Sequence, residues 1–219
     1  MYHVRFQAMP RPRSLTLDQI GAAGLAVIDH DGLAGLTMRS VAHRLRVSTM
    51  ALYRYVADRY ELEALVLERA LADLDTSPPA DGDWTKRIEI MLLRVRDALA
   101  AHPEVIPLTM AHRQSSPSVL RWSETVARIL ANAGLTGRDR VVALRCLSAY
   151  AVGALQLAYL GPLAGRGTAV IAALPPDEFP YMSGTARSAA NVDPDTEFRG
   201  GLAILLAGLA CRGHPGTSQ

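Results

Sequence analysis

The residues with the clearest chemical potential lie between Thr37 and Val56, where hydroxyl, aromatic and arginine side chains gather. A small residue, Ala42, stands where two short helices would touch over a tight turn. Their shared core would be formed by Val41, Leu45, Val47, Leu52 and Val56. The side chains left on the outer side are those of Ser48, Thr49, Met50, Tyr53, Arg54 and Tyr55. A second helix that presents such side chains at its N-terminal end suits insertion into the major groove of DNA.

Cap residues mark where the helices that position these side chains begin. Thr37, Ser48 and Asp58 each have a short side chain that can accept a hydrogen bond from a backbone N–H in the first helical turn. An earlier apolar pattern at helical spacing ends at Asp31-Gly32. We therefore expect helices over residues 17–30, 38–45, 49–56 and 59–74.

Composition and charge agree with a helical chain that has a basic end. Hydrophobic residues make up 49% of the 219 residues and aromatic residues only 5%, and such a balance favours helices over strands. The net charge is +2, but residues 1–60 hold eight arginines against four aspartates and so carry +4. A basic segment on a mildly acidic remainder indicates a polyanionic partner for that segment.

Turn-forming residues divide the chain. The run Ser77-Pro78-Pro79 with Gly82 separates the first helices from a second helical region. There we expect helices over 84–101, 103–114, 118–133, 138–160 and 195–211, and a loop-rich stretch over 164–193. The predicted fold is all-α, with a three-helix head joined by a fourth helix to a larger helical body. The expected parts are an N-terminal arm (1–13), a helix-turn-helix domain (14–75) and a regulatory and dimerisation domain (82–213).

Three runs resemble the DNA-binding domain of the tetracycline-repressor (TetR) family: LTMRSVA at 36–42, VSTMALYRYV at 47–56 and DRYEL at 58–62. Together with the preceding helix and its exit DGLAGLT at 31–37, the resemblance covers about residues 14–74. The remainder is similar to the family's C-terminal domain, through a helix ending near His102-Pro103, a turn at 133–135 and a last helix with Gly200-Gly201.

The resemblance implies a role for each matching residue. Base edges would be contacted by Arg39, Thr49, Met50 and Arg54, and phosphates by Thr37, Ser48, Tyr53, Tyr55 and Arg59. Arginine suits guanine because it can pair with both acceptors, and hydroxyl groups suit phosphates. Arg11 and Arg13 of the N-terminal arm would add contacts to the polyanion. The chain departs from the family pattern at Arg46, where a turn glycine is usual, and at Tyr55 and Arg59, which replace a common His and Lys.

The stretch from Cys146 to Ala164 carries no charge and is long enough to span a membrane. It contains Ser148, Gln156 and Gly161-Pro162, however, so it also fits a helix that is buried on most sides. The resemblance implies that this helix and the last one form a four-helix bundle with the same helices of a second copy. We therefore expect a homodimer rather than a membrane span, with Leu155 in the interface.

A set of apolar residues with a few polar groups could line a small-molecule site in the regulatory region. The candidates are Met91, Val95, His102, Met110, Trp122, Tyr150, Gln156 and Tyr159, although each could equally be plain core. Tetracycline specificity is not expected, because the sequence of residues 103–107 departs from that of the tetracycline-binding member of the family. We expect no catalytic site, no metal and no cofactor, since the histidines are far apart and no metal-ligand spacing is present. The two cysteines lie far apart, which favours a reducing cytoplasm.

The expected function is repression by a homodimer that occupies a palindromic operator and is released by a small-molecule effector. Two heads held at a fixed spacing would read the two half-sites. A DNA-binding regulator without any small-molecule effector is the alternative. A filled, dry body would favour that alternative, and an enclosed pocket would count against it.

Overall fold

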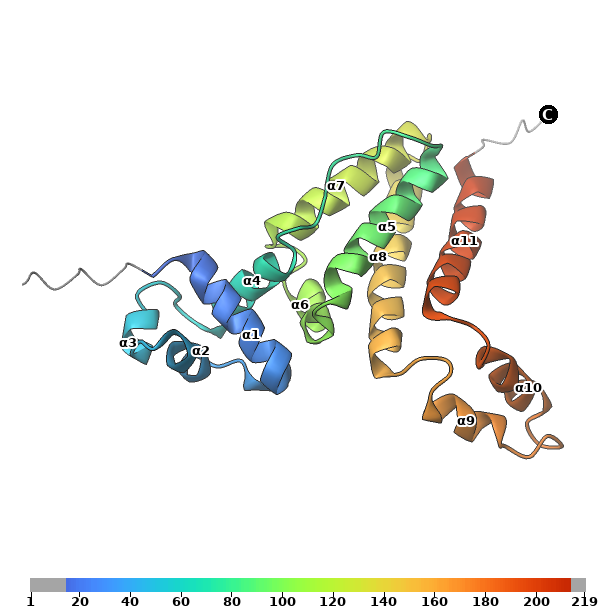
Figure 1. The fold of residues 1–219 in the computed structure, drawn as a ribbon. Coiled ribbons are helices and arrows are strands. Elements are labelled where there is room, and N and C mark those ends of the chain that lie inside the picture. Colours follow the sequence, from blue (N-terminus) through green and yellow to red (C-terminus); the bar gives the residue numbers. More distant parts are fainter. Residues whose placement is uncertain (1–14, 214–219) are drawn as a thin grey trace, which may run out of the picture.

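The structure is a computed structural model that describes residues 15–213, with side chains to residue 211. These residues form eleven α-helices, one 3-10 helix and no strand, so the predicted all-α class is confirmed (Figure 1). The expected arm over 1–13, with Arg11 and Arg13, lies outside the described residues. Below, residues 15–75 are called the head and residues 82–211 the body.

The head consists of α1 (Leu17–Gly35), α2 (Met38–Leu45), α3 (Thr49–Leu52) and α4 (Arg59–Ala70). Helix α1 packs mainly on α4, and Gly24 lets them approach closely, because a Cβ there would lie 2.5 Å from Cγ2 of Val66. Regular helical geometry in α1 is broken at Gly32, which has a φ of 71°, where the sequence predicted a stop. The left-handed conformation suits glycine, which has no Cβ to clash.

Two head helices are shorter than expected. Helix α3 ends at Leu52 rather than at Val56, and α4 ends at Ala70 rather than near residue 74. After α3 the chain turns, with the N–H of Tyr55 and of Val56 both donating to the carbonyl of Leu52. This turn buries Val56 in the head core and leads into the extended cap residue Asp58. Tertiary burial of one side chain therefore overrides continuation of the helix.

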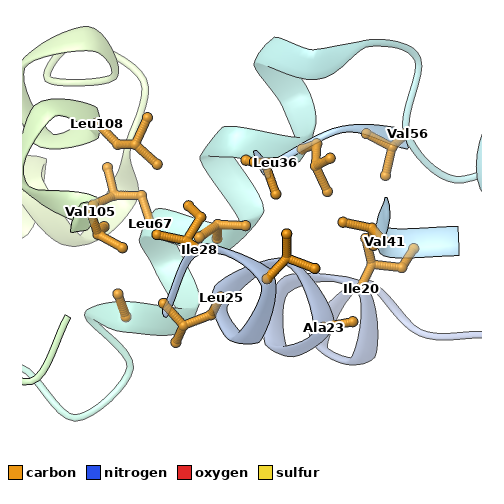
Figure 2. Packing of buried hydrophobic residues seen from close by; sticks show 14 of the residues in the cluster. Ile20, Ala23, Leu25, Ile28, Leu36, Val41, Val56, Leu67, Val105 and Leu108 are labelled. Carbon is orange, nitrogen blue, oxygen red and sulfur yellow. The ribbon is translucent and has the colours of Figure 1, made fainter. Parts of the chain in front are cut away.

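The body is built on α5 (Trp84–Ala100), α7 (Pro117–Asn132), α8 (Gly137–Leu160) and α11 (Pro194–Gly213), which pack around a second apolar core (Figure 1). A 3-10 helix, η1 (Pro103–Val105), and α6 (Ile106–Ala111) connect α5 to α7 and face the head. Apolar side chains of this connection, Val105 and Leu108, belong to the same cluster as Ile28 and Leu67 of the head (Figure 2). Head and body thus share a continuous core.

The predicted loop over 164–193 is wrong. The chain there forms α9 (Arg166–Ala172) and α10 (Pro180–Ala189), which pack on each other. Proline is common in loops, but Pro180 occupies the first turn of α10, where its missing N–H has no helical partner to lose. Helix α9 has no buried residue, so little of this pair is covered within the monomer.

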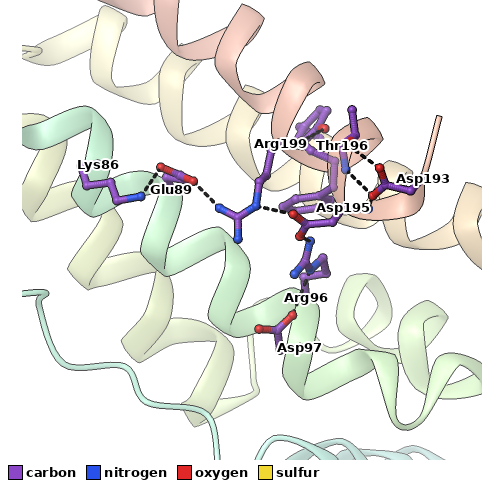
Figure 3. A network of polar contacts seen from close by, with 10 residues as sticks. Lys86, Glu89, Arg96, Asp97, Asp193, Asp195, Thr196 and Arg199 are labelled. Carbon is purple, nitrogen blue, oxygen red and sulfur yellow. Dashed lines mark hydrogen bonds and ion pairs between the residues drawn. The ribbon is translucent and has the colours of Figure 1, made fainter.

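A chain of polar contacts joins α5 to the start of α11 (Figure 3). Arg199 donates to Glu89 of α5 at 2.5 Å and to Asp195 at 2.6 Å, and Asp195 also accepts from Arg96 at 2.8 Å. The guanidinium of Arg96 lies 5.0 Å from the centre of the Phe198 ring. Hydrogen bonds from Arg96 and Arg199 lower the pKa of the Asp195 carboxyl below its usual range. The network fixes α11 against the body.

Candidate DNA interface and ligand cavity

The turn between α2 and α3 depends on one residue in an unusual conformation. Arg46 has a φ of 57° and a ψ of 39°, which is the left-handed region expected for the glycine that it replaces. The N–H groups of Arg46 and Val47 donate back to the carbonyls of His43 and Ala42, so the last turn of α2 is closed. The steep crossing of α2 and α3 is therefore obtained at some conformational cost.

The predicted caps are present at all three helix starts. The Thr37 hydroxyl oxygen accepts from the N–H of Ser40 at 3.0 Å, the Ser48 oxygen from Ala51 at 3.1 Å and the Asp58 carboxylate from Glu61 at 2.9 Å. These bonds satisfy backbone donors that the first helical turn leaves unpaired. They also fix the direction in which the outer side chains of α3 leave the head.

The predicted DNA-binding residues all have exposed or partly exposed side chains in the head. Met50 is 75% exposed and Tyr53 47%, while Leu52 between them is completely buried. Thr49 is half-buried, and the others are exposed: Thr37, Arg39, Ser48, Arg54, Tyr55 and Arg59. Neither tyrosine is a core residue. Arg39 and Arg54 make no polar contact within residues 15–213, so both guanidinium groups are available to a ligand.

Arg59 differs from Arg39 and Arg54 because its guanidinium already donates hydrogen bonds within the protein. Its Nε donates to Glu63 at 2.7 Å, and a terminal nitrogen donates to the carbonyl of Leu33 at 3.1 Å. The pair lies one helical turn apart and is partly exposed, and such pairs contribute little net stability. A phosphate would therefore compete with Glu63 for this guanidinium.

The body contains a cavity of about 630 Å³ between α5, α6, α7 and α8, called the body cavity below. Its volume falls in the range of small-molecule sites. It is lined by Leu71, Leu74, Val95, Leu99, Thr109, Met110, Arg113, Gln114, Val119, Trp122, Ser123, Val141, Leu144, Arg145, Ser148, Ala149, Ala151, Val152 and Leu155.

Three of the eight residues predicted for a ligand site, Val95, Met110 and Trp122, line the body cavity. The other five do not. Met91 is buried beneath it, with its carbonyl accepting from the indole of Trp122 at 2.9 Å. Tyr150 points to α11, where it donates to the carbonyl of Phe198 at 2.6 Å, and burial raises its pKa.

The remaining three predicted ligand residues lie on other faces of the body. Gln156 is exposed, and Nδ1 of His102 lies 2.9 Å from the carboxylate of Asp29 in α1. Tyr159 donates to Glu104, which raises its pKa, and it lines a second cavity of about 560 Å³ near the start of α11.

Two cavity residues that sequence reasoning had not selected carry positive charge. Arg113 follows α6, and Arg145 lies on α8, so they come from different walls of the body cavity. Arg145 directly precedes the uncharged stretch that begins at Cys146, which was the only available signal in the sequence.

Polar contacts tie α4 of the head to the segment that follows α6. His112 is completely buried, and its Nε2 lies 3.4 Å from the carboxylate of Glu63. Glu68 accepts from the Ser118 hydroxyl at 2.7 Å and from its N–H at 3.2 Å, and it also accepts from the Ser116 hydroxyl. Helix α4 thus carries Arg59, a predicted DNA contact, at one end and holds the start of α7 at the other.

Helix α8 is the one helix among the described residues that is long and apolar enough to cross a membrane, but only 22% of its most apolar window is buried within the monomer. Apolar side chains face outward on α8 and α11: Leu157, Leu160 and Ile204, the last two 80% and 78% exposed. Leu155, which had been expected in the dimer interface, is instead 6% exposed and lines the body cavity. It faces inward because it lies on the side of α8 that also carries Ala151.

Comparison with known proteins agrees with this architecture. A family model described as "Tetracyclin repressor-like, C-terminal domain" matches residues 77–212. The tetracycline repressor class A of transposon 1721 from Escherichia coli is 30% identical over 193 residues, which cover 87% of this chain and 88% of that protein. The repressor DrrR1 of Streptomyces coeruleorubidus is 33% identical over 67% of this chain, and the match spans only 54% of that protein.

A solved structure, the TetR-family protein ActR of Streptomyces coelicolor in complex with (S)-DNPA, superposes with a TM-score of 0.80. It is 25% identical, and the match covers 92% of this chain and all of the other. Family model, relatives and fold therefore agree, and the chain belongs to the tetracycline-repressor (TetR) family.

Proposed function

We propose that the protein is a homodimeric transcriptional repressor that binds a palindromic DNA operator and is released by a small-molecule effector. The observation that carries the proposal is the exposed side of α3 and its surroundings, where capped helices present side chains suited to DNA. Its relatives are named as repressors, not as enzymes. Such a repressor acts beside the chromosome, in the bacterial cytoplasm.

In the DNA complex, α3 would enter the major groove with Thr49, Met50 and Arg54 toward the base edges and Arg39 beside them. Thr37, Ser48, Tyr53, Tyr55 and Arg59 would hold phosphates on either side of that groove. The free guanidinium groups of Arg39 and Arg54 support base contacts. For Arg59 the binding of a phosphate would replace the contact to Glu63.

The dimer would form through the outward apolar side chains of α8 and α11. Leu160 and Ile204 are too large and too exposed to be explained by monomer packing, and stable homodimer interfaces resemble a protein core cut in half. Two copies related by a twofold axis would place two heads for two half-sites of a palindrome.

The effector would bind in the body cavity, and its binding would favour a head arrangement that does not fit the operator. The route to the head is short, because α6 carries cavity residues and is followed by His112, which contacts Glu63 of α4. An effector can release DNA only if it binds the two head arrangements with different affinity. A filled body would have favoured the alternative of a regulator without an effector, and the body of this protein contains a cavity instead.

Binding-site selection from random and genomic DNA with the full chain tests the proposal. We expect a palindromic consensus, with affinity that falls steeply as salt rises, because each released phosphate contact contributes about 0.9 to the slope of log K against log salt. Arg54→Ala should relax the preference at one base pair in each half-site. Arg59→Ala should weaken all sequences alike.

Arg128, an exposed arginine of α7 in the body, gives the matched control, and Arg128→Ala should leave the consensus and the affinity unchanged. An unchanged consensus with uniformly weaker binding of Arg54→Ala would assign Arg54 to the phosphate backbone instead. A chain that selects no DNA sequence would refute the repressor.

A further inference from the structure

The body cavity has an uneven distribution of polar groups. Its inner wall is apolar, because Leu71, Leu99 and Trp122 are buried there. The polar atoms at this depth are already used: the indole N–H donates to the carbonyl of Met91 at 2.9 Å, and the Thr109 hydroxyl donates to the carbonyl of Ile106 at 2.6 Å. A ligand that reaches this wall therefore gains from apolar and ring contacts, not from hydrogen bonds.

The mouth of the cavity carries positive charge without compensation. Arg113 and Arg145 are both exposed and both line the cavity, Arg113 from the segment after α6 and Arg145 from α8. Arg113 uses one terminal nitrogen on the carbonyl of Met110 at 2.9 Å, which leaves its other donors open. Arg145 makes no polar contact within residues 15–213. No aspartate or glutamate is among the residues that line the cavity.

The second cavity of the body has the opposite character. It is lined by three carboxylates, those of Asp97, Asp195 and Glu197, against the single cation Arg96. Arg96 is already paired with two of these carboxylates, since it donates to both Asp97 and Asp195. An anionic ligand would be repelled there and attracted to the body cavity, so charge alone selects between two cavities of similar volume.

We propose that the effector of this protein is a largely apolar organic anion whose acidic group binds Arg113 and Arg145 at the mouth of the body cavity. The apolar part, of drug size, lies against Leu71, Leu99 and Trp122. The regulatory role of this ligand rests on the proposed function, whereas the ligand class follows from the cavity itself. Arginine suits this role because its planar guanidinium pairs with a carboxylate through two parallel hydrogen bonds.

Three probes with one ring system test the charge preference. Anthraquinone-2-carboxylate, its carboxamide and 2-(aminomethyl)anthraquinone share their shape and differ in charge. Their binding to the full chain is measured by calorimetry and by quenching of tryptophan fluorescence. We expect the carboxylate to bind at least about tenfold more tightly than the carboxamide, which corresponds to one charge-assisted hydrogen bond, and the amine to bind most weakly.

Three variants identify the groups responsible. Arg113→Gln and Arg145→Gln should each lower the affinity for the carboxylate by about tenfold and leave that for the carboxamide within about twofold. Arg128→Gln removes the same charge from α7 away from the cavity and should change neither. Thermal unfolding of each variant establishes that it is folded.

Equal binding of carboxylate and carboxamide, a preference that survives in the double variant, or no binding of any probe would overturn the proposed ligand class. DNA retention measured in the same samples tests the repressor separately. A carboxylate that binds through both arginines without releasing selected DNA would support the ligand class and refute release by this effector class.

Discussion

The head and the body solve the problem of burying apolar surface differently. In the head, Ile20, Leu36, Leu52 and Leu62 are completely buried, and Gly24 brings α1 against α4. In the body, α8 and α11 bury one side, yet they leave Leu160 and Ile204 in contact with solvent. The head is complete as a monomer, whereas the body has an unused apolar face that a second copy can cover.

This difference in packing indicates which region could respond to a ligand. We expect the tightly packed head to keep the geometry of α3, since packed cores do not deform continuously. The body, by contrast, combines a cavity with exposed apolar side chains on α8 and α11, so the proposed ligand binding and association would act on the same helices. The contacts of α4 with His112, Ser116 and Ser118 connect these two kinds of structure.

The largest expected effect comes from a cavity in the head. Leu62→Ala removes a fully buried side chain and should lower the free energy of unfolding by about 2–5 kcal/mol. Leu160→Ala shortens the same side chain at a position that is 80% exposed and should leave monomer stability nearly unchanged. Urea unfolding of both variants measures the contrast. Equal losses would mean that the head is no better packed than the outer face of the body.

The second effect concerns the unused apolar face. Ile204→Glu places a charge where a partner would cover it, so we expect the dimer dissociation constant to rise at least about 100-fold, which is about 2.7 kcal/mol. Sedimentation velocity should show a folded monomer. Leu155→Glu, on the buried side of α8, should disrupt the monomer itself. A stable Ile204→Glu dimer would exclude this face as the interface.

The third effect tests the connection between the two regions. Glu68→Ala leaves the buried hydroxyl of Ser116 without its acceptor and should cost about 1–3 kcal/mol. Because head and body still share an apolar core, calorimetric unfolding should remain a single transition with a lower midpoint. The exposed Glu124 of α7 provides the control, and Glu124→Ala should retain the wild-type midpoint.

A smaller effect of opposite sign is expected at the turn before α3. Arg46→Gly relieves the left-handed backbone and should raise the stability by up to about 1 kcal/mol. Arg44→Gly, within α2, should instead lower it by about 0.8–1 kcal/mol. Thermal unfolding distinguishes the two signs, and a loss of stability in Arg46→Gly would show that the arginine side chain contributes more than the strain costs.

The smallest effect is a pH dependence in the polar network. The lowered pKa of Asp195 means that its ionised form is stabilised in the folded protein. This stabilisation is fully present above the unfolded pKa of about 3.9 and is lost as the pH falls through the lower, folded pKa. The stability difference between the wild type and Asp195→Asn should therefore shrink below about pH 4. Denaturant unfolding at several pH values measures it, and a constant difference would contradict the assignment.

Local signals allowed much of the fold to be predicted. Thr37, Ser48 and Asp58 are caps whose chemistry acts within one helical turn, so they identified the starts of α2, α3 and α4. The end of α3 could not be predicted in this way, because burial of Val56, although expected, fits a longer helix as well as the turn that follows Leu52. The start of α10 at Pro180 could not be predicted for a related reason, since proline is compatible with a loop and with the first turn of a helix.

The sequence predicted the lining of the body cavity less completely than the exposed residues of the head. Outer residues of a short capped helix can be read from spacing alone, as Met50 and Tyr53 illustrate. Cavity residues depend on which side of a long helix faces which neighbour. Helix α8 is apolar almost all round, so spacing could not tell that Tyr150 contacts α11 while Arg145 reaches the cavity.

The brevity of α3 limits how many base pairs one head would contact in the proposed DNA complex. Four residues rise only about 6 Å along a helix, less than two steps of the base-pair ladder at about 3.4 Å each. If each base pair contributes about 1–3 kcal/mol to the binding free energy that distinguishes sites, a single head cannot select one site among about a million competing sites. In the proposed dimer the second head would supply the missing selectivity, because two short base sequences at a fixed spacing are rarer in a genome than either sequence alone.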